Sequence, residues 1–517
     1  MTIKKMISLL ALLMVLSACA VNPVTGKSEL ALISESQEMA IGKKQYGPSR
    51  QGQGGDYVAD PALVTYVQQV GQRLAKVSDR QLPYEFVVIN SSVPNAWALP
   101  GGKIAINRGL LLELTSEAEL AAVLGHEIVH AAARHSAQGI ERGMLMQGAV
   151  MAAGIATQNS GYSDLAIKGA GLAANLVNHK YGRDAERESD HYGMKYMEKA
   201  GYDVRAAIAL QETFVRLSKS NNSNWLTGLF ASHPPSQERV DNNRRDAELL
   251  TPGGEVGEAR YQQAIAHLKK VKPAYDAYDE GVKALKEKKY DQARALAEKA
   301  ISIEPKEGLF HALLGEAQQG KGAKNTALTS YSRAIQANPD FFYFYEKRGE
   351  LQNQLGYSAG AKKDLERGAA LFPTAASYLA LGQFAEQEGN TKQAIEYYRD
   401  AAQSNSQSGR LAQQSLVQLD LQDHPSRYLK AHFVLDRAGR LLVSVKNPTD
   451  FPVDQLRVAL YYLNQKRQRE QVTLRLNGVV APQQSLMVRT GIESMNGHQL
   501  RERGFQVQVV GARVAGH

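Results

Sequence analysis

This sequence has almost no cysteine, and it has no long apolar runs beyond its N-terminus. With one cysteine, the chain can form no internal disulfide. A helix that spans a bilayer needs about 18 or more apolar residues in a row, and no stretch after residue 18 reaches that length. The Ala- and Gly-rich ranges 144–157 and 165–177 come closest. For them we expect a soluble helical pair rather than an interfacial membrane contact.

The N-terminus has the pattern of an exported lipoprotein. The apolar segment Ile7–Leu16 follows two lysines and is too short to cross a bilayer. It leads into Leu-Ser-Ala-Cys, a lipobox, which predicts a signal peptide over 1–18 and a lipidated Cys19 that starts a tether over 19–33. The alternative for a lone cysteine is a small buried side chain. Because Ala20 and not Asp follows Cys19, we expect the outer membrane of a Gram-negative bacterium, on the periplasmic face.

A His-Glu-Ile-Val-His stretch stands where a helix is expected. Ser116 and Glu119 form a capping-box pair, and apolar residues follow at helical spacing. Histidines four residues apart lie on one helical face, so His126 and His130 can bind one metal ion. Glu127, between them, can take a proton from a water at that metal. The alternative is a surface helix with two histidines on its polar face.

A later acidic stretch supplies a third ligand. Catalytic zinc takes three protein ligands and keeps one position open, and two histidines with a glutamate are a common set. Glu186 lies in an expected helix over 184–199, and Asp190 follows one turn later on the same face. We predict that Glu186 binds Zn²⁺, one ion per chain, and that Asp190 accepts a hydrogen bond from a ligating histidine. Glu188 is the competing ligand, and an ordinary charged helix face is the plainer alternative.

Four stretches together resemble the gluzincin peptidases of the HtpX and BepA type, over about residues 30–250. The resemblance implies an α+β zincin-like, mainly helical catalytic domain, which we assign to 34–250. It implies that His233 can bind zinc as a regulatory fourth ligand and hold the enzyme latent. It also implies that the clients are unfolded or misassembled outer-membrane proteins. The four stretches are 126–130, 186–190, Asn-Ala-Trp-Ala-Leu-Pro-Gly-Gly at 95–102, and His-Pro-Pro at 233–235 with Arg239.

By the same resemblance, the segment 95–98 is an edge strand beside the cleft, where a substrate can bind. β-Branched and aromatic residues predict strands at 84–89 and 103–106, with a Pro-Gly-Gly turn before the second. A strand edge left open beside the zinc can bind an extended peptide through its backbone, whereas a plain hairpin under the catalytic helix is the alternative. Arg239 is a candidate oxyanion donor or, equally, a salt-bridge partner of a carboxylate. The substrate-binding candidates are therefore Asn95, Ala96, Trp97, Ala98 and Arg239.

A repeat begins after the Gly-rich segment 251–257. Glycines recur from Gly281 to Gly382 at steps of 34, 34 and 33, and alanines and prolines recur in step. This period, with small residues where helices cross, is typical of tetratricopeptide repeats. We predict an all-α solenoid of about four repeats plus a capping helix over 275–421, after a linker and connecting helix at 251–274. Such repeats form a concave binding surface, and the resemblance implies that it binds clients or the outer-membrane protein assembly machinery.

The last module, 428–517, alternates apolar and polar residues. Strands are expected at 441–445, 456–462, 472–476 and 505–509, which predicts a small β-sandwich similar to FxLYD modules. The module holds 13 Lys and Arg against 6 Asp and Glu, a net charge of +7. An anionic membrane, lipopolysaccharide or an acidic partner can bind such a face, and a basic face that only aids solubility is the alternative. Nucleic acid is not expected in this compartment.

These features together predict a zinc endopeptidase held at the outer membrane, with Glu127 as the general base and repeats that hold clients. A chaperone or assembly scaffold with latent proteolysis is the first alternative. A zinc amidase that acts on cell-wall material is the second.

Overall fold

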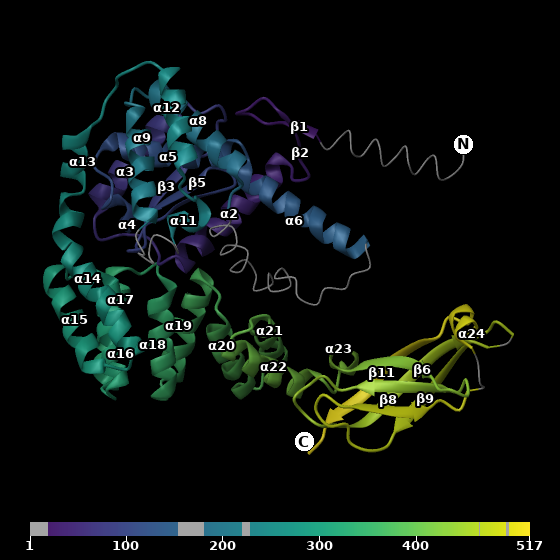
Figure 1. Ribbon diagram of the computed structural model, residues 1–517. Coiled ribbons are helices and arrows are strands. Elements are labelled where there is room, and N and C mark those ends of the chain that lie inside the picture. The colour runs from purple at the N-terminus through teal and green to yellow at the C-terminus, as the bar shows by residue number, and fades with distance from the viewer. Residues whose placement is uncertain (1–18, 153–179, 220–227, 465, 493–495, 517) are drawn as a thin grey trace, which may run out of the picture. The chain divides into compact units, whose positions relative to one another are not determined.

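The computed structural model of the protein describes residues 19–152, 180–219, 228–464, 466–492 and 496–516 (Figure 1). The predicted signal peptide 1–18 and the predicted helix 165–177 lie outside these residues. The chain divides into two compact units, the first ending at Pro373 and the second running Thr374–His517.

A small sheet wrapped by helices forms the N-terminal part of the first unit. The strand order is β3-β5-β4, with β3 parallel and β4 antiparallel to β5. A Pro-Gly-Gly turn joins β4 to β5 as predicted, and Gly101 and Gly102 adopt φ of +76° and +77°, which side chains disfavour. β4 and β5 are buried along their whole length. The elements are β1 (Cys19–Val21), β2 (Ser28–Leu30), α2 (Glu35–Gly52), α3 (Pro61–Ala75), β3 (Glu85–Ile89), β4 (Ala96–Leu99), β5 (Lys103–Asn107), α4 (Arg108–Leu111), α5 (Glu117–Ala132), α6 (His135–Ala152), α8 (Arg183–Lys199), α9 (Arg205–Ser218), α11 (Leu229–Ser232), α12 (Gln237–Glu248) and α13 (Glu258–Ala264).

Three helical pairs of the repeat type complete the first unit. Gly315 and Gly349 stand where paired helices cross, since a Cβ there would lie 2.8 Å from the Tyr331 ring and 2.9 Å from Leu365. The small residues of the repeat are therefore explained as predicted. The first helix begins at Ala266, inside the range 251–274 that was predicted to hold a linker and a connecting helix. The helices are α14 (Ala266–Lys286), α15 (Tyr290–Ile303), α16 (Gly308–Gly320), α17 (Lys324–Ala337), α18 (Phe342–Gln354) and α19 (Ser358–Leu371).

One hydrophobic core runs through the first unit, from the helices around the β3-β5-β4 sheet into the repeats. Tyr275, Phe310 and Phe344 of the repeat helices belong to the same buried cluster as the α3 and α5 side chains. Arg108 of α4 lies over the Tyr275 ring at 3.4 Å, which adds a cation–π contact across this junction. The first three helical pairs are thus packed on the helices around the β3-β5-β4 sheet.

The second unit holds three further repeat-type helices and the β-sandwich. The sandwich has two three-stranded sheets, β10-β7-β6 and β11-β8-β9, and Val443, Val445, Val458 and Leu460 are fully buried in it. The four predicted strands are confirmed, whereas β6 and β10 were not predicted. The elements are α20 (Ala375–Gln387), α21 (Thr391–Ala401), α22 (Gln407–Asp420), α23 (Pro425–Tyr428), β6 (Lys430–Leu435), β7 (Leu441–Lys446), β8 (Val453–Leu463), β9 (Arg469–Leu476), β10 (Ser485–Arg489), α24 (Gly497–Glu502) and β11 (Gln506–Val514).

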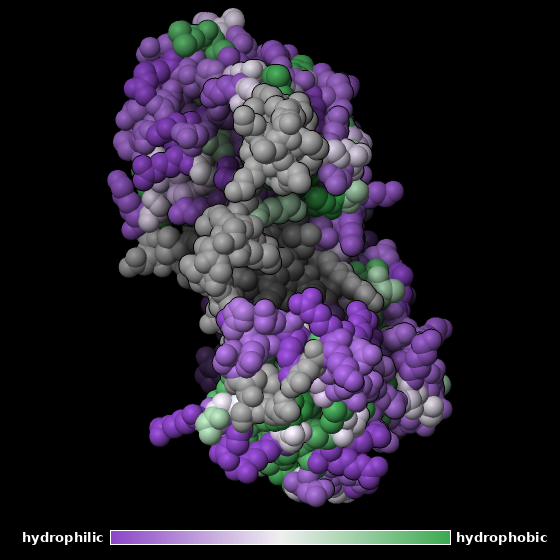
Figure 2. Space-filling view, turned by 90° about the vertical axis from the view of Figure 1, so that its right-hand side faces the viewer, coloured by the Kyte–Doolittle hydropathy of each residue, from purple (hydrophilic) through white to green (hydrophobic). Residues whose placement is uncertain are grey.

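Within the described residues, no helix has both the length and the apolar character needed to cross a bilayer. Of the residues coloured by hydropathy in Figure 2, most are hydrophilic, and the hydrophobic ones gather in a few areas.

Candidate metal centre

Helix α5 carries the His-Glu-Ile-Val-His residues and is buried along almost its whole length. Ser116 caps it, because its hydroxyl accepts a hydrogen bond from Glu119 N at 3.2 Å. The Glu119 carboxylate accepts from Thr115 N at 2.6 Å, so the second half of the predicted capping box is displaced by one residue. His130 is 0% and Glu127 is 1% exposed. The alternative of a surface helix is therefore wrong.

Helices α5 and α8 cross at a pair of glycines. A Cβ on Gly193 would lie 3.1 Å from His126 N, and one on Gly125 would lie 3.2 Å from Gly193 O. A side chain at either position would push the two helices apart, because both gaps are tighter than ordinary van der Waals contact. This close crossing holds Glu186, in the first turn of α8, against the histidines of α5.

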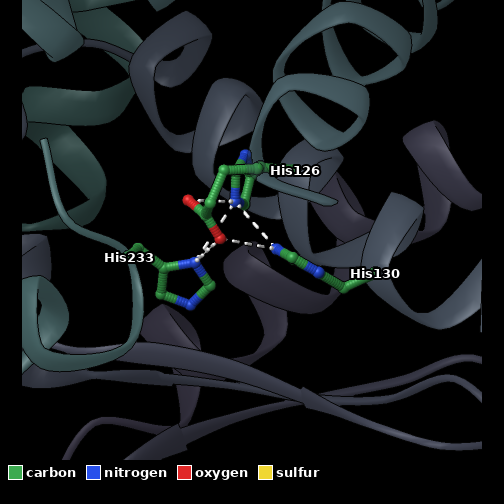
Figure 3. A group of neighbouring side chains, drawn as sticks. His126, His130 and His233 are labelled. Atoms are coloured by element: carbon green, nitrogen blue, oxygen red, sulfur yellow. Dashed lines mark hydrogen bonds and ion pairs between the residues drawn. The ribbon is translucent and has the colours of Figure 1, made fainter. Parts of the chain in front are cut away.

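Four side chains converge on one point, and Figure 3 shows His126, His130 and His233 facing one another. His126 Nε2 lies 3.0 Å from His130 Nε2 and 3.3 Å from His233 Nδ1. Glu186 Oε1 lies 3.0 Å from His233 Nδ1 and 3.4 Å from His130 Nε2. One ligand atom from each of the four residues lies within 4.8 Å of the others. The structure thus brings together all four residues predicted to bind zinc.

Asp190 and Arg239 fix the positions of His126 and Glu186. Asp190 Oδ1 lies 3.0 Å from His126 Nδ1, as its place one turn after Glu186 predicts. Arg239 donates to both Asp190 oxygens, at 2.6 and 2.7 Å, and its Nη1 lies 2.7 Å from Glu186 Oε2. Burial raises the pKa of Asp190, but Arg239 and His126 lower it overall, so the carboxyl stays ionised. Arg239 therefore forms salt bridges with carboxylates, and its guanidinium is not free to stabilise an oxyanion.

The electrostatics of this group favour a bound cation. Burial lowers the pKa of His126, but the Glu186 and Asp190 carboxylates raise it overall. When His126 Nδ1 donates to Asp190, its Nε2 presents a lone pair toward His130 Nε2. A cation between the two rings removes the repulsion between the lone pairs of these two nitrogens. Among the described residues, buried Glu127 Oε2 has no hydrogen-bond partner. Imidazole nitrogens with one carboxylate are a set that zinc binds, so these residues fit the ion.

A further histidine, which was not predicted, lies behind His130. His135 Nδ1 is 2.9 Å from His130 Nδ1, and His135 Nε2 is 3.3 Å from Glu188 Oε2. Glu188 also binds Lys27 Nζ at 3.0 Å, so it supports the rear of His130 through His135 and is not one of the four donors. The short spacing from His130 to His135 was the available signal. Helical periodicity did not predict that the two histidine rings meet, because the helix is interrupted at Arg134, which adopts φ +62°.

Strand β4 lies at the edge of its sheet, but the edge is not open. Ala98 O accepts hydrogen bonds from Ser136 Oγ at 3.2 Å and from Tyr181 OH at 3.4 Å. The Tyr181 ring also stacks on His130, with centroids 3.8 Å apart. Residues 95–98 are all buried, so the prediction of an open edge is wrong. A peptide can pair with β4 only after the two hydroxyl groups have moved away.

Known proteins match this chain over the segment that holds the donor group. The model of Peptidase family M48 matches residues 61–246, and a Tetratricopeptide repeat model matches residues 375–408. The Beta-barrel assembly-enhancing protease of Escherichia coli K12 is 24% identical over 354 residues, which are 61% of this chain and 70% of that protein. A Vibrio cholerae protein of the same description is 32% identical over 204 residues, which are 38% of this chain but only 41% of that protein.

A third relative decides the family. Metalloprotease YcaL of Escherichia coli K12 is 30% identical over 184 residues, which are 34% of this chain and 68% of that protein. The match extends over two thirds of a curated metalloprotease, and the M48 segment 61–246 includes all four donors. The chain therefore belongs to peptidase family M48, whose members are zinc metallopeptidases.

Proposed function

We propose that this chain hydrolyses peptide bonds in misfolded or misassembled outer-membrane proteins, with one zinc ion held by His126, His130 and Glu186. The observation that carries the proposal is the buried group of four ligand atoms within 4.8 Å of one another. Glu127 Oε1 lies 3.5 Å from His233 Nε2, a member of that group. Two relatives described as a beta-barrel assembly-enhancing protease support the class of client.

Glu127 is the proton carrier in this proposal. Zinc, when bound, supplies a Lewis acid that acidifies water and polarises a peptide carbonyl. The Glu127 carboxylate takes a proton from the attacking water and gives it to the nitrogen of the leaving amine. Burial raises the pKa of this carboxyl, against the opposing effect of His233 and His126, and a raised pKa makes a carboxylate a better proton acceptor. Asp190 keeps His126 oriented by accepting its Nδ1–H.

We infer that His233 holds the free enzyme latent. A catalytic zinc needs one position without a protein ligand, and His233 Nδ1 lies 3.0 Å from Glu186 Oε1, inside the donor group. Pro234 and Pro235 follow and stiffen the backbone that carries the ring. Clients that bind the repeats would activate the enzyme by favouring a state in which His233 has withdrawn.

The proposed anchor is a lipid on Cys19, with the enzyme on the periplasmic face of the outer membrane. The lipobox pattern is the support for this part of the proposal. Cys19 begins β1, which pairs with β2. In the loop that follows β1, Asn22 Nδ2 donates to Ala133 O, just past the end of α5, at 3.2 Å. A lipid at Cys19 would therefore place the catalytic helix close to the membrane surface, where outer-membrane proteins insert.

The test is cleavage of an unfolded porin by the purified chain. Glu127→Gln should bind zinc like the parent and lose at least 99% of the cleavage. Glu212→Gln is the matched control, because it makes the same chemical change on a half-exposed side chain of α9. The chelator-treated parent should be inactive and recover with added zinc. Cleavage by Glu127→Gln at the parent's rate would exclude the proposed proton carrier.

A repeat-based assembly scaffold is the second candidate, and the fourth donor His233 favours it because a fully ligated zinc would keep proteolysis silent. Glu127→Gln separates the two in cells that lack the chain. Full rescue of outer-membrane protein assembly by this variant supports the scaffold, and failure to rescue at normal protein level supports the peptidase.

A further inference from the structure

The β-sandwich has a pocket on the sheet β11-β8-β9 that the peptidase does not use. Its volume is about 400 Å³, within the range of small-ligand sites. Arg457 of β8 and Arg475 of β9 line it, and both are exposed on the solvent face of the sheet, while their neighbours Leu456 and Leu476 are buried. Arg513 of β11 lies on the same pocket.

Two of the three arginines of this pocket, Arg457 and Arg475, have no carboxylate partner among the described residues. Arg457 and Arg475 stand directly opposite each other in the antiparallel register of β8 and β9, where like charges destabilise a sheet. No carboxylate of the described residues lies within ion-pair distance of either side chain. Arg513 Nε lies 3.5 Å from Asp454 Oδ1, yet neither atom makes a hydrogen bond with the described residues.

The backbone around the pocket departs from regular strand geometry in both β11 and β8. Strand β11 has register irregularities on both sides of Gly511, which pairs with Arg457. A Cβ on Gly511 would overlap the Arg457 guanidinium, with its Nη2 at 2.9 Å, so a side chain there would displace this group from its position across β11. Gln455, two residues before Arg457, adopts φ +51°, which costs energy for a residue with a side chain.

We propose that Arg457, Arg475 and Arg513 form a binding site for a phosphoryl group. Arg457 and Arg475 stand opposite each other without a carboxylate partner, at a cost in repulsion, and a bound anion would offset their charge. A carboxylate is satisfied by one guanidinium fork, whereas a phosphoryl group has three oxygens and up to two negative charges to share among several. The site accounts for part of the module's net charge of +7. Its ligand is a phospholipid or lipopolysaccharide headgroup, or free phosphate.

Two probes distinguish these sources, both applied to the full chain carrying Cys19→Ser so that no acyl chain contributes. The first is inorganic phosphate, followed by titration calorimetry. The second is cosedimentation with vesicles of phosphatidylglycerol in phosphatidylcholine, compared with pure phosphatidylcholine. Binding of phosphate and of the anionic vesicles identifies a headgroup site, and binding of phosphate alone identifies a site for the free ion. Either binding should weaken as salt is raised, because the arginines are exposed.

Three variants test the geometry. Arg457→Ala with Arg475→Ala should reduce the observed binding at least tenfold. Gly511→Ala should reduce it by a similar factor without changing any charge, because it only displaces the Arg457 guanidinium; the melting temperature confirms its fold. Arg469→Ala is the matched control, an exposed arginine at the other end of β9 that should bind within twofold of the parent.

Three results would overturn the proposal. The first is binding of neither phosphate nor anionic vesicles. The second is equal loss in Arg469→Ala and in the double variant, or no loss in Gly511→Ala, since this would show a diffuse effect of net charge. The third is tight binding of polyglutamate with no competition from phosphate, which would assign the pocket to an acidic protein.

Discussion

Asp190→Asn should weaken zinc binding although Asp190 is not one of the four donors. Asp190 is 8% exposed and its Oδ1 lies 3.0 Å from His126 Nδ1. Asparagine keeps the shape and one acceptor but removes the charge that holds Arg239, which then remains paired only with Glu186 and competes with the metal for it. Loss of such a supporting carboxylate costs about 10- to 100-fold in metal affinity, or about 1.4–2.7 kcal/mol.

The measurement is zinc affinity by competition with a chelating dye at neutral pH, with circular dichroism as a check on the fold. Asp184→Asn is the matched control, because it makes the same change on the same helix at a side chain that is 92% exposed. It should bind zinc within twofold of the parent. If Asp190→Asn also stayed within twofold, or if both variants lost affinity equally, the supporting role of Asp190 would be refuted.

Three further predictions concern the ligands, the latency and the anchor. Glu186→Gln should lose most of its zinc by elemental analysis, whereas Glu188→Gln should keep it; equal loss would overturn the ligand assignment. His233→Ala should raise basal cleavage of unfolded protein, measured as initial rate, with zinc near one per chain; a variant that lost zinc or activity would show that His233 is needed rather than inhibitory. The Cys19→Ser variant should no longer be found in the outer-membrane fraction after cell fractionation. A variant that was still found there would point to another anchor.

Three of the four candidate donors, His126, His130 and Glu186, could be predicted because their signals are local. His126 and His130 are related by one helical turn, and Glu186 and Asp190 by another, so each pair needed only a correct helix assignment. What the sequence did not reveal was how closely the two helices approach. That distance is set by the contact of Gly125 with Gly193. The role of these two glycines can be recognised only when α5 and α8 are known to cross.

The surroundings of the metal centre could not be predicted, because they join distant segments without a periodic signal. Lys27 reaches Glu188 across 161 positions of sequence, and Tyr181 reaches Ala98 across 83. The edge of β4 looked open because nothing in the sequence around it indicates the hydroxyl groups that cover it. Lone polar contacts of this kind depend on the finished packing.

The repeat period also concealed a boundary. The repeat spacing continues past Pro373, with a step of 33 residues in place of 34, yet the first compact unit ends there. The reason is that the first three pairs are packed on the peptidase helices. Gln51 of α2 donates to Asp340 O at 2.7 Å, and Gly55 leaves room for the Phe341 ring, which a Cβ would contact at 2.6 Å. The repeat period reflects contacts between neighbouring repeats, and it gives no information about contacts with another domain.

The basic module shows the same limit most clearly. Its net charge can be counted from the sequence, but where the charge gathers depends on strand register. Because side chains alternate between the two faces of a strand, a slip of one residue in β8 would turn Arg457 into the core and bring Leu456 to the surface. The observed register does the opposite: it sets Arg457 beside Arg475 and over Gly511. An evenly spread basic face would aid solubility without any such arrangement, so the register is the reason to regard this charge as a binding site.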